Sequence, residues 1–112
     1  MAECIFCKII NKELPSEIIS EGEKFIVIQD IKPVARLHLL IIPKKHIPSM
    51  NDLGPEDKEL IGDMVLLAKK IAKDKGVQDT GYRLVFNAGA DAGQTVDHLH
   101  LHLLGGEKLP FA

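Results

Sequence analysis

Three histidines alternate with leucines near the end of the chain, in the segment His98–Leu104 (His-Leu-His-Leu-His-Leu-Leu). Strict alternation is the period of a β-strand, so His98, His100 and His102 are expected on one face and the leucines on the other. Imidazole changes charge near neutral pH, and its neutral ring nitrogen can act as a nucleophile. The pattern therefore predicts a strand whose leucine face packs in a core and whose histidine face is available for chemistry.

A single metal ion does not explain all three histidines. Residues two apart on a strand are separated by roughly 6.6 Å, so the outer pair lies roughly 13 Å apart. Zinc, by contrast, binds nitrogen ligands at about 2.0–2.1 Å. A row of imidazoles beside an anionic substrate fits better, because one ring can attack phosphorus while its neighbours donate hydrogen bonds to phosphoryl oxygens. The alternative is a chance run of histidines on a solvated strand face, which the otherwise apolar segment and its Gly105-Gly106 ending argue against.

Other residues with suitable chemistry precede this segment. The loop that leads into it contains Gly89 and Gly93, whose backbone N–H groups could cradle phosphate oxygens, although most such loops are only turns. Thr95 could add a hydroxyl. Asp30 could bind ribose hydroxyls, or it could simply form a turn or cap a helix. His38 opens an apolar run, and pairing of strands can bring it beside the three histidines.

Cys4 and Cys7 have the spacing of half a zinc site. His46 and one of the three alternating histidines could supply the other half. A thioredoxin-like redox motif would follow a strand in a βαβ pattern, and no such strand fits before Cys4. Two free thiols are the third alternative.

Composition favours a single folded domain. The 112 residues suit one domain, residues 1–112, and 46% of them are hydrophobic, which is enough for a packed core. The net charge is −2 and no basic stripe is visible, so general nucleic-acid binding is not expected. The longest apolar runs are far too short for a membrane span. The N-terminal segment Met1–Lys8 lacks the pattern of a signal peptide, which predicts a cytoplasmic protein.

The expected elements give an α+β fold with a largely antiparallel sheet, one long helix and a short N-terminal helix. Gly76 should end the long helix, whose apolar stripe is wide enough for deep burial or for contact with a second subunit. The expected ranges are a short helix or turn over Cys4–Lys12, strands over Glu17–Glu21, Lys24–Gln29, His38–Ile42, Tyr82–Asn87 and from His98, and the long helix from Pro55 to about Lys75.

The histidine segment matches the signature of the histidine triad (HIT) superfamily, and the chain resembles that superfamily over nearly its whole length. The other matching segments, in order, are Ile5-Phe6-x-Lys8-Ile9, Asp30-Ile31-x-Pro33, His38-Leu39-Leu40-Ile41-Ile42-Pro43-Lys44-x-His46, Asn87-x-Gly89, Gly93-Gln94-Thr95-Val96 and Gly105-Gly106. The chain is most similar to the Hint branch, the nucleoside phosphoramidases. This resemblance implies a single HIT domain with a HIT-like fold, and a homodimer whose two sheets join across the interface.

The resemblance also implies an activity. Such enzymes bind purine nucleoside monophosphates, and they hydrolyse the P–N bond of the corresponding phosphoramidates through a nucleotidyl-histidine intermediate. His100 would be the nucleophile, His102 would contact the phosphate or the leaving group, and His38 and His98 would orient the nucleophile. No metal is required for this chemistry.

The resemblance assigns the remaining site residues as well. Some members carry a structural zinc, for which Cys4, Cys7, His46 and His98 occupy the matching positions. The implied nucleotide-binding residues are Ile5, Phe6, Ile9, Ile28 and Ile31 for the base, Asp30 for the ribose, Asn87 near the phosphate and ribose, and Gly93, Gln94 and Thr95 for the phosphate.

Two other functions compete with this reading: a dinucleoside polyphosphate hydrolase, and a nucleotide- or partner-binding scaffold with incidental catalysis. The sequence does not define the leaving amine, the cellular partner or the choice between adenine and guanine. Asp97 stands where an aromatic or neutral residue is common. The short tail Glu107–Ala112 lacks the tryptophan of well-studied Hint tails, which leaves the amine preference open.

Overall fold

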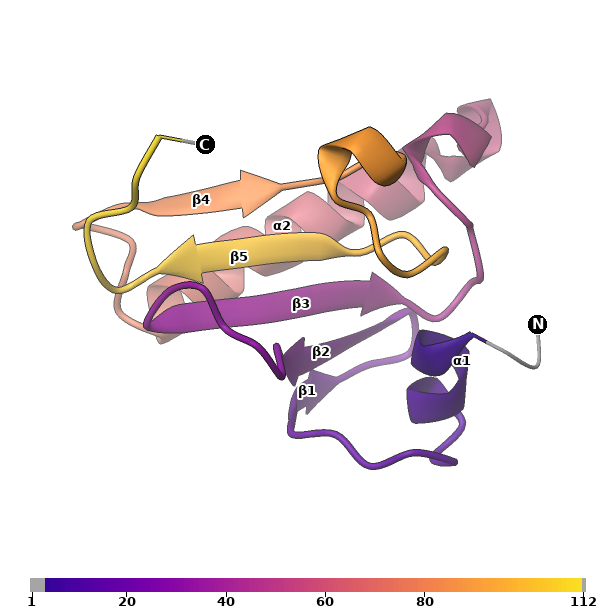
Figure 1. The fold of residues 1–112 in the computed structure, drawn as a ribbon, viewed down its shortest axis with the longest axis horizontal. Helices are drawn as coiled ribbons and strands as arrows, with labels where there is room; N and C mark the ends of the chain where they lie inside the picture. Colours follow the sequence, from indigo (N-terminus) through magenta and orange to yellow (C-terminus); the bar gives the residue numbers. More distant parts are fainter. Residues whose placement is uncertain (1–3, 112) are drawn as a thin grey trace.

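The computed structural model describes residues 4–111, which form an antiparallel five-stranded sheet with helices on its two faces (Figure 1). The strand order is β1-β2-β3-β5-β4. This confirms the expected α+β class with one long helix. The elements are α1 (Ile5–Ile10), β1 (Ile18–Glu21), β2 (Phe25–Gln29), β3 (Leu37–Pro43), α2 (Lys58–Asp74), β4 (Tyr82–Val85) and β5 (Leu101–Gly105), with short 3₁₀ turns at Met50–Asp52, Pro55–Asp57 and Ala90–Ala92.

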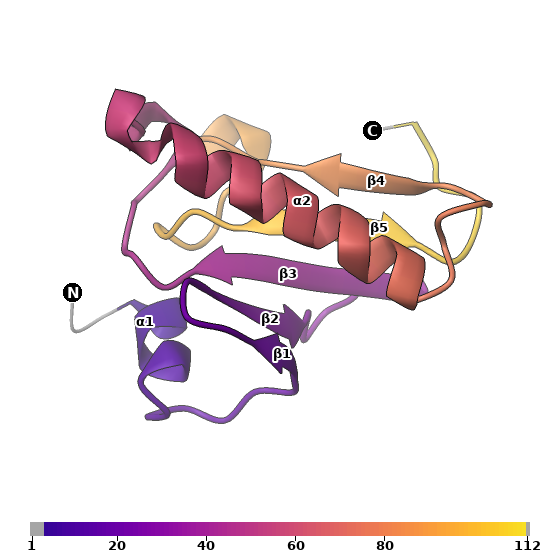
Figure 2. The ribbon, with the colours of Figure 1, turned by 180° about the vertical axis from the view of Figure 1, so that it is seen from behind.

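The central strand β3 is buried on both faces, and all of its side chains except that of His38 are apolar. One face packs under α2, which crosses the sheet on the side turned forward in Figure 2. The other face carries Ile26, Ile28, Leu40 and Ile42, and it packs against α1. The sheet therefore separates a large core from a smaller one, and the histidine face of β5 belongs to the smaller side.

The histidine strand starts later than the alternation suggests. Backbone pairing with β3 begins at Leu101, opposite Ile41, so His98–His100 form no part of the ladder. Leu99 N–H instead donates to the carbonyl of Ile47, and the side chain of His98 reaches the carbonyl of Pro43. Proline has no N–H to continue a ladder, which accounts for the end of the pairing at this point.

The long helix begins and ends close to the expected positions. Pro55 opens a 3₁₀ turn before α2 starts at Lys58, and Gly76 follows the helix with a φ of +79°, a conformation that glycine adopts without strain. Burial does not cover the whole apolar stripe, because Val65 and Leu66 remain 40% and 62% exposed.

Two expectations fall partly outside the described residues: the absence of a signal peptide over Met1–Lys8, and the end of the tail at Ala112. Among residues 4–111, no helix combines the length and the apolar character needed to cross a membrane.

The core under α2 provides the first test. Leu103 of β5 is completely buried, so Leu103→Ala should lower the free energy of unfolding by about 2–5 kcal/mol through lost burial and a new cavity. Val34→Ala is the matched control, because Val34 is 72% exposed and its truncation should change the value by less than about 0.5 kcal/mol. Urea denaturation of both variants measures the difference, and equal effects would contradict this description of the core.

Candidate functional site

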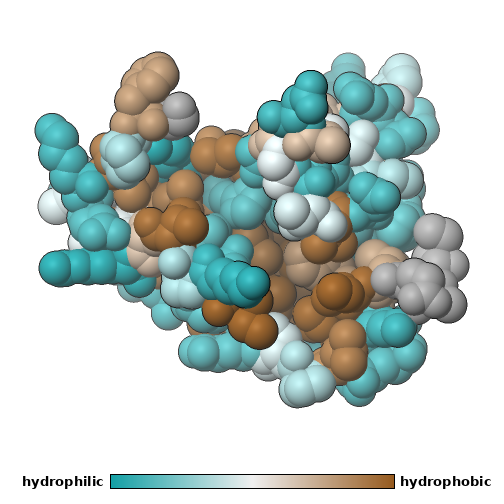
Figure 3. Space-filling model, in the orientation of Figure 1, coloured by the Kyte–Doolittle hydropathy of each residue, from teal (hydrophilic) through white to brown (hydrophobic). Residues whose placement is uncertain are grey.

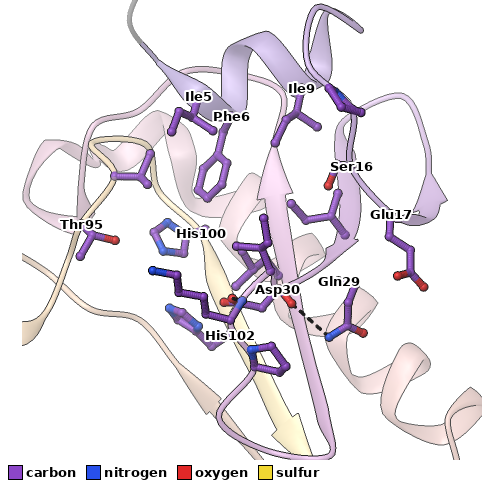
Figure 4. A pocket seen from close by; sticks show the side chains of 17 residues that line it. Ile5, Phe6, Ile9, Ser16, Glu17, Gln29, Asp30, Thr95, His100 and His102 are labelled. Atoms are coloured by element: carbon purple, nitrogen blue, oxygen red, sulfur yellow. Dashed lines mark hydrogen bonds between the residues drawn. The ribbon is translucent and has the colours of Figure 1, made fainter.

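A cavity of about 750 Å³ lies beside α1, between the loop after β2 and the segment that leads into β5 (Figure 4). This volume is within the range of small-molecule sites. Figure 3 shows apolar side chains gathered in the hollowed part of this face, near α1. Among the apolar lining residues are Ile5, Phe6, Ile9, Ile28, Ile31, Leu40 and Val96, and the polar ones include Asp30, Thr95, His100 and His102.

His100 is held in one orientation and one tautomer. Its Nδ1 lies 2.7 Å from the backbone oxygen of His98, and a carbonyl can only accept, so Nδ1 carries the proton. The Phe6 ring packs against the imidazole in a T-shaped arrangement, with ring centroids 5.0 Å apart and an angle of 78° between the ring planes. The other nitrogen, Nε2, therefore keeps its lone pair, which is the form that a nucleophile needs.

A second hydrogen-bonded series fixes His102. His38 Nδ1 accepts a hydrogen bond from the Val34 N–H at 3.1 Å, so the proton of His38 is on Nε2. That nitrogen lies 2.9 Å from Nδ1 of His102 and 3.2 Å from Oδ2 of Asp30. Because His102 accepts at Nδ1, its own proton is on Nε2. The ring centroids of His100 and His102 lie 5.0 Å apart. His100 thus offers a lone pair at Nε2, and the neighbouring His102 offers a hydrogen-bond donor at Nε2.

Register explains how these histidines meet. Leu104 of β5 is directly opposite His38 of β3, so His102 is the diagonal neighbour of His38 on the adjacent strand. Asp30, His38 and His102 lie close enough to suggest a metal site. However, a metal-binding histidine normally donates its other N–H, whereas His38 accepts at its other nitrogen. We therefore interpret this group as a hydrogen-bonded series.

Burial keeps the histidines neutral. It lowers the pKa of His102 to about 4, with a smaller contribution from the neighbouring imidazoles of His100 and His38. Burial also lowers the pKa values of His38, His98 and His100 below their usual 6.5. Near pH 7 the imidazoles consequently provide lone pairs and N–H donors rather than full positive charges.

His98 points away from the cavity into a second cluster. Its ring is completely buried, and its Nε2–H donates to the carbonyl of Pro43 at 2.8 Å. Its Nδ1 lies 3.3 Å from Cys4 Sγ, 3.7 Å from Cys7 Sγ and 3.1 Å from His46 Nδ1. The sequence alone did not decide which of the three alternating histidines would join the cysteines, and the structure selects His98.

The donor set of this second cluster fits a zinc ion. Tetrahedral zinc with its usual bond lengths places its ligand atoms roughly 3.3–3.8 Å apart. Three of the four contacts found between these side chains, at 3.3, 3.3 and 3.7 Å, are of this size. The Nε2–H of His98 is satisfied by a backbone carbonyl, which is the usual arrangement behind a metal-bound histidine. The residues Cys4, Cys7, His46 and His98 thus form a candidate metal-binding cluster.

Three of the expected nucleotide-binding residues do not line the cavity: Asn87, Gly93 and Gln94. The Asn87 side chain donates to the carbonyl of Ala92, and Gly93 turns the loop with a φ of +88°. Gln94 accepts from the Gly89 N–H and donates to the carbonyls of Pro48 and Val96. In this structure these residues hold the loop that carries Thr95, which does line the cavity.

Several lining residues escaped the sequence reasoning, including Glu17, Gln29, Lys32 and Leu40. Leu40 and Gln29 belong to strands, where only register reveals which side chains face the cavity. Lys32 was detectable, because it directly follows Asp30 and Ile31, which were expected to bind the ribose and the base.

Comparison with known proteins agrees with this geometry. Residues 3–109 match the family model described as "Scavenger mRNA decapping enzyme C-term binding". The purine nucleoside phosphoramidase of Escherichia coli K12 is 44% identical over 96% of this chain and 90% of its own length. The chain belongs to the histidine triad family. Like a HIT family hydrolase of Legionella pneumophila, it is a hydrolase; the two chains superpose with a TM-score of 0.95 at 46% identity, over 97% of each.

A further HIT relative is informative about metal. A zinc-bound histidine triad family protein of Mycobacterium smegmatis has a TM-score of 0.82 and 35% identity, over 98% of this chain and 81% of its own. That relative is zinc-bound, and in this HIT chain the Cys/His cluster is the candidate metal site.

Acid should destabilise the protein through these buried imidazoles. The unfolded chain takes up protons near pH 6.5, whereas folded His102 does so only near pH 4. Its contribution to stability is therefore complete above about pH 6.5 and is lost as the pH falls towards 4. His38, His98 and His100 act in the same direction. Urea denaturation between these pH values should show falling midpoints, with a shallower decline for His102→Gln; an identical decline would contradict the prediction.

Proposed function

We propose that this HIT hydrolase cleaves the P–N bond of purine nucleoside phosphoramidates and releases a nucleoside monophosphate and an amine. The observation that carries the proposal is the complementary pair in the cavity, His100 with a free Nε2 lone pair and His102 with an Nε2–H. The name of the E. coli relative, a purine nucleoside phosphoramidase, supports the same substrate class.

The cavity suggests how the ligand would lie. The purine would pack among the apolar side chains of Ile5, Phe6, Ile9, Ile28 and Ile31, and the ribose hydroxyls would bind the carboxylate of Asp30. The phosphate would then reach His100 and His102, with Thr95 on the other side of the imidazoles from Asp30 (Figure 4). Small-molecule sites are usually lined by apolar side chains with a few polar groups that fix the orientation of the ligand.

The proposed reaction has two displacements. Nε2 of His100 attacks the α-phosphorus, a new P–N bond forms, and the bond to the amine breaks; the amine leaves with the electron pair and takes up a proton. His102 donates its Nε2–H to the phosphoryl oxygens or to the leaving group. Water then displaces His100, which regains its lone pair, and the nucleoside monophosphate is released. The water gives up one proton, which restores the Nε2–H of His102 if that proton went to the amine and otherwise passes to solvent.

The Cys/His cluster would hold a structural zinc ion. Zinc would supply no chemistry to the substrate in this proposal; it would fix the ring of His98, whose carbonyl orients His100. Four protein ligands would leave no open coordination position, as is typical of structural sites.

A homodimer is also part of the proposal. Within residues 4–111, β4 has a neighbouring strand on one side only, so its other edge is available for pairing. The exposed Val65 and Leu66 of α2 are apolar surface that a second copy could cover.

Turnover of adenosine 5′-phosphoramidate tests the reaction. The wild type should release AMP, and His100→Asn should be slower by at least about 10³-fold because the nucleophile is lost. AMP binding by the variant serves as the control for an intact cavity. Equal activity would place the nucleophile elsewhere, and AMP binding without any turnover by the wild type would favour a dinucleoside polyphosphate hydrolase or a nucleotide-binding scaffold.

Metal analysis tests the zinc site. Purified protein should contain about one zinc ion per chain, and Cys7→Ser should lose most of it because a neutral hydroxyl is a poor zinc ligand. A chelator should lower the melting temperature of the wild type and leave that of Cys7→Ser nearly unchanged. Zinc-free wild type with two titratable thiols, even after purification with added zinc, would refute this part of the proposal.

A further inference from the structure

The charges around the cavity are unusual for a site that receives an anion. Its lining includes the carboxylates of Glu17 and Asp30, which disfavour a phosphate. Lys32 is the only lysine or arginine among the described residues that line it. The neighbouring His102 is neutral near pH 7, so it offers a hydrogen bond without a full charge. A bound anion would therefore find one permanent positive charge in the cavity wall.

The backbone places Lys32 firmly at this wall. Its N–H donates to Oδ1 of Asp30 at 2.8 Å, which closes a tight turn, and Pro33 restricts the next residue. Asp30 lies across His100 and His102 from Thr95 (Figure 4), so the loop of Lys32 forms the opposite wall to the loop of Thr95.

The ammonium group of Lys32 is available to a ligand. The side chain is exposed, and Lys32 takes part in none of the ion pairs found among residues 4–111. By contrast, Lys12 and Lys44 both contact Glu21, and Lys45 pairs with the buried Asp57. A lysine ammonium is a flexible point charge that binds anionic oxygens well.

We propose that Lys32 determines specificity by pairing with an anionic oxygen of the bound ligand. This inference rests on the proposed function, and it identifies the side chain that supplies a positive charge to the bound anion. The oxygen belongs either to the phosphate of the nucleotide or to a carboxylate on the leaving amine, as in a phosphoramidate of an amino acid. A contact between Lys32 and the phosphate would favour every nucleotide over its nucleoside. A contact between Lys32 and the carboxylate would favour phosphoramidates whose leaving amine carries that group.

Binding of AMP and of adenosine separates charge recognition from cavity shape. Lys32→Met keeps an apolar stem and the backbone turn but removes the charge. If the oxygen belongs to the phosphate, this variant should weaken AMP binding by about 2–5-fold, the range of an exposed ion pair, and leave adenosine binding unchanged. Lys32→Glu should weaken AMP binding further. The difference should shrink between about 0.01 M and about 0.15 M salt.

Lys69→Met is the matched control. Lys69 is exposed on α2, which covers the opposite face of the sheet, and its removal makes the same change in net charge. It should leave both affinities at their wild-type values. Isothermal titration calorimetry of the wild type and the three variants supplies all the comparisons.

Two phosphoramidates distinguish the sources of the oxygen. For adenosine phosphoramidates of glycine and of ethylamine, kcat/KM should fall equally in Lys32→Met if the lysine binds the phosphate. If AMP binding is unchanged and only the glycine compound is hydrolysed more slowly, Lys32 binds the carboxylate. Equal loss of AMP and adenosine binding, or no change with any ligand, would overturn the inference.

The same experiment separates the inference from the reaction. If Lys32→Met weakens AMP selectively but neither phosphoramidate is hydrolysed by the wild type, the inference stands and the proposed function fails. If both compounds are hydrolysed and Lys32→Met behaves like Lys69→Met, the proposed function stands and the inference fails.

Discussion

Complete burial of His98 is the constraint on which the rest of the site depends. Burial of a polar side chain is costly unless its polar atoms have partners, and three polar atoms of this residue have separate partners. Nε2 donates to Pro43, Nδ1 faces the Cys/His cluster, and the carbonyl accepts from His100. A single residue thus connects the end of β3, the metal-binding cluster and the orientation of the proposed nucleophile.

One face of the sheet carries the main hydrophobic core, and the other carries the candidate site. The face under α2 is uniformly apolar and contains most of the buried side chains. The opposite face is covered by the short helix α1 and by the segment around Val96, which leaves room for the cavity between them. Burial on this face also lowers the pKa values of His100 and His102, because their rings are withdrawn from water. Among the described histidines, His38 is the one that lies within ion-pair distance of a carboxylate, that of Asp30.

Local pattern was sufficient for what depends on a single segment. The alternation in β5, the continuous apolar run of β3 and the proline before α2 predicted the elements and the fold class, because each signal lies within one element. Properties that depend on pairing were not accessible in this way. The start of β5 at Leu101 depends on Pro43 of another strand, and the choice of His98 for the cysteine cluster depends on where α1 packs. The side chains of Asn87 and Gln94 have amide groups that suit a ligand or a loop equally well, and only the folded geometry shows that they hold the loop.

Helix α1 has a consequence for binding thermodynamics. Its six residues are too few to be stable alone, so its order comes from what it contacts. Cys7, within the helix, and Cys4, at its N-cap, face the cluster with His98, whereas Phe6 and Ile9 form the cavity wall. A metal bound on one side of this helix and a purine bound on the other would each stabilise the same short helix. Linkage then requires reciprocity: whatever factor the metal contributes to nucleotide affinity, the nucleotide contributes to metal affinity.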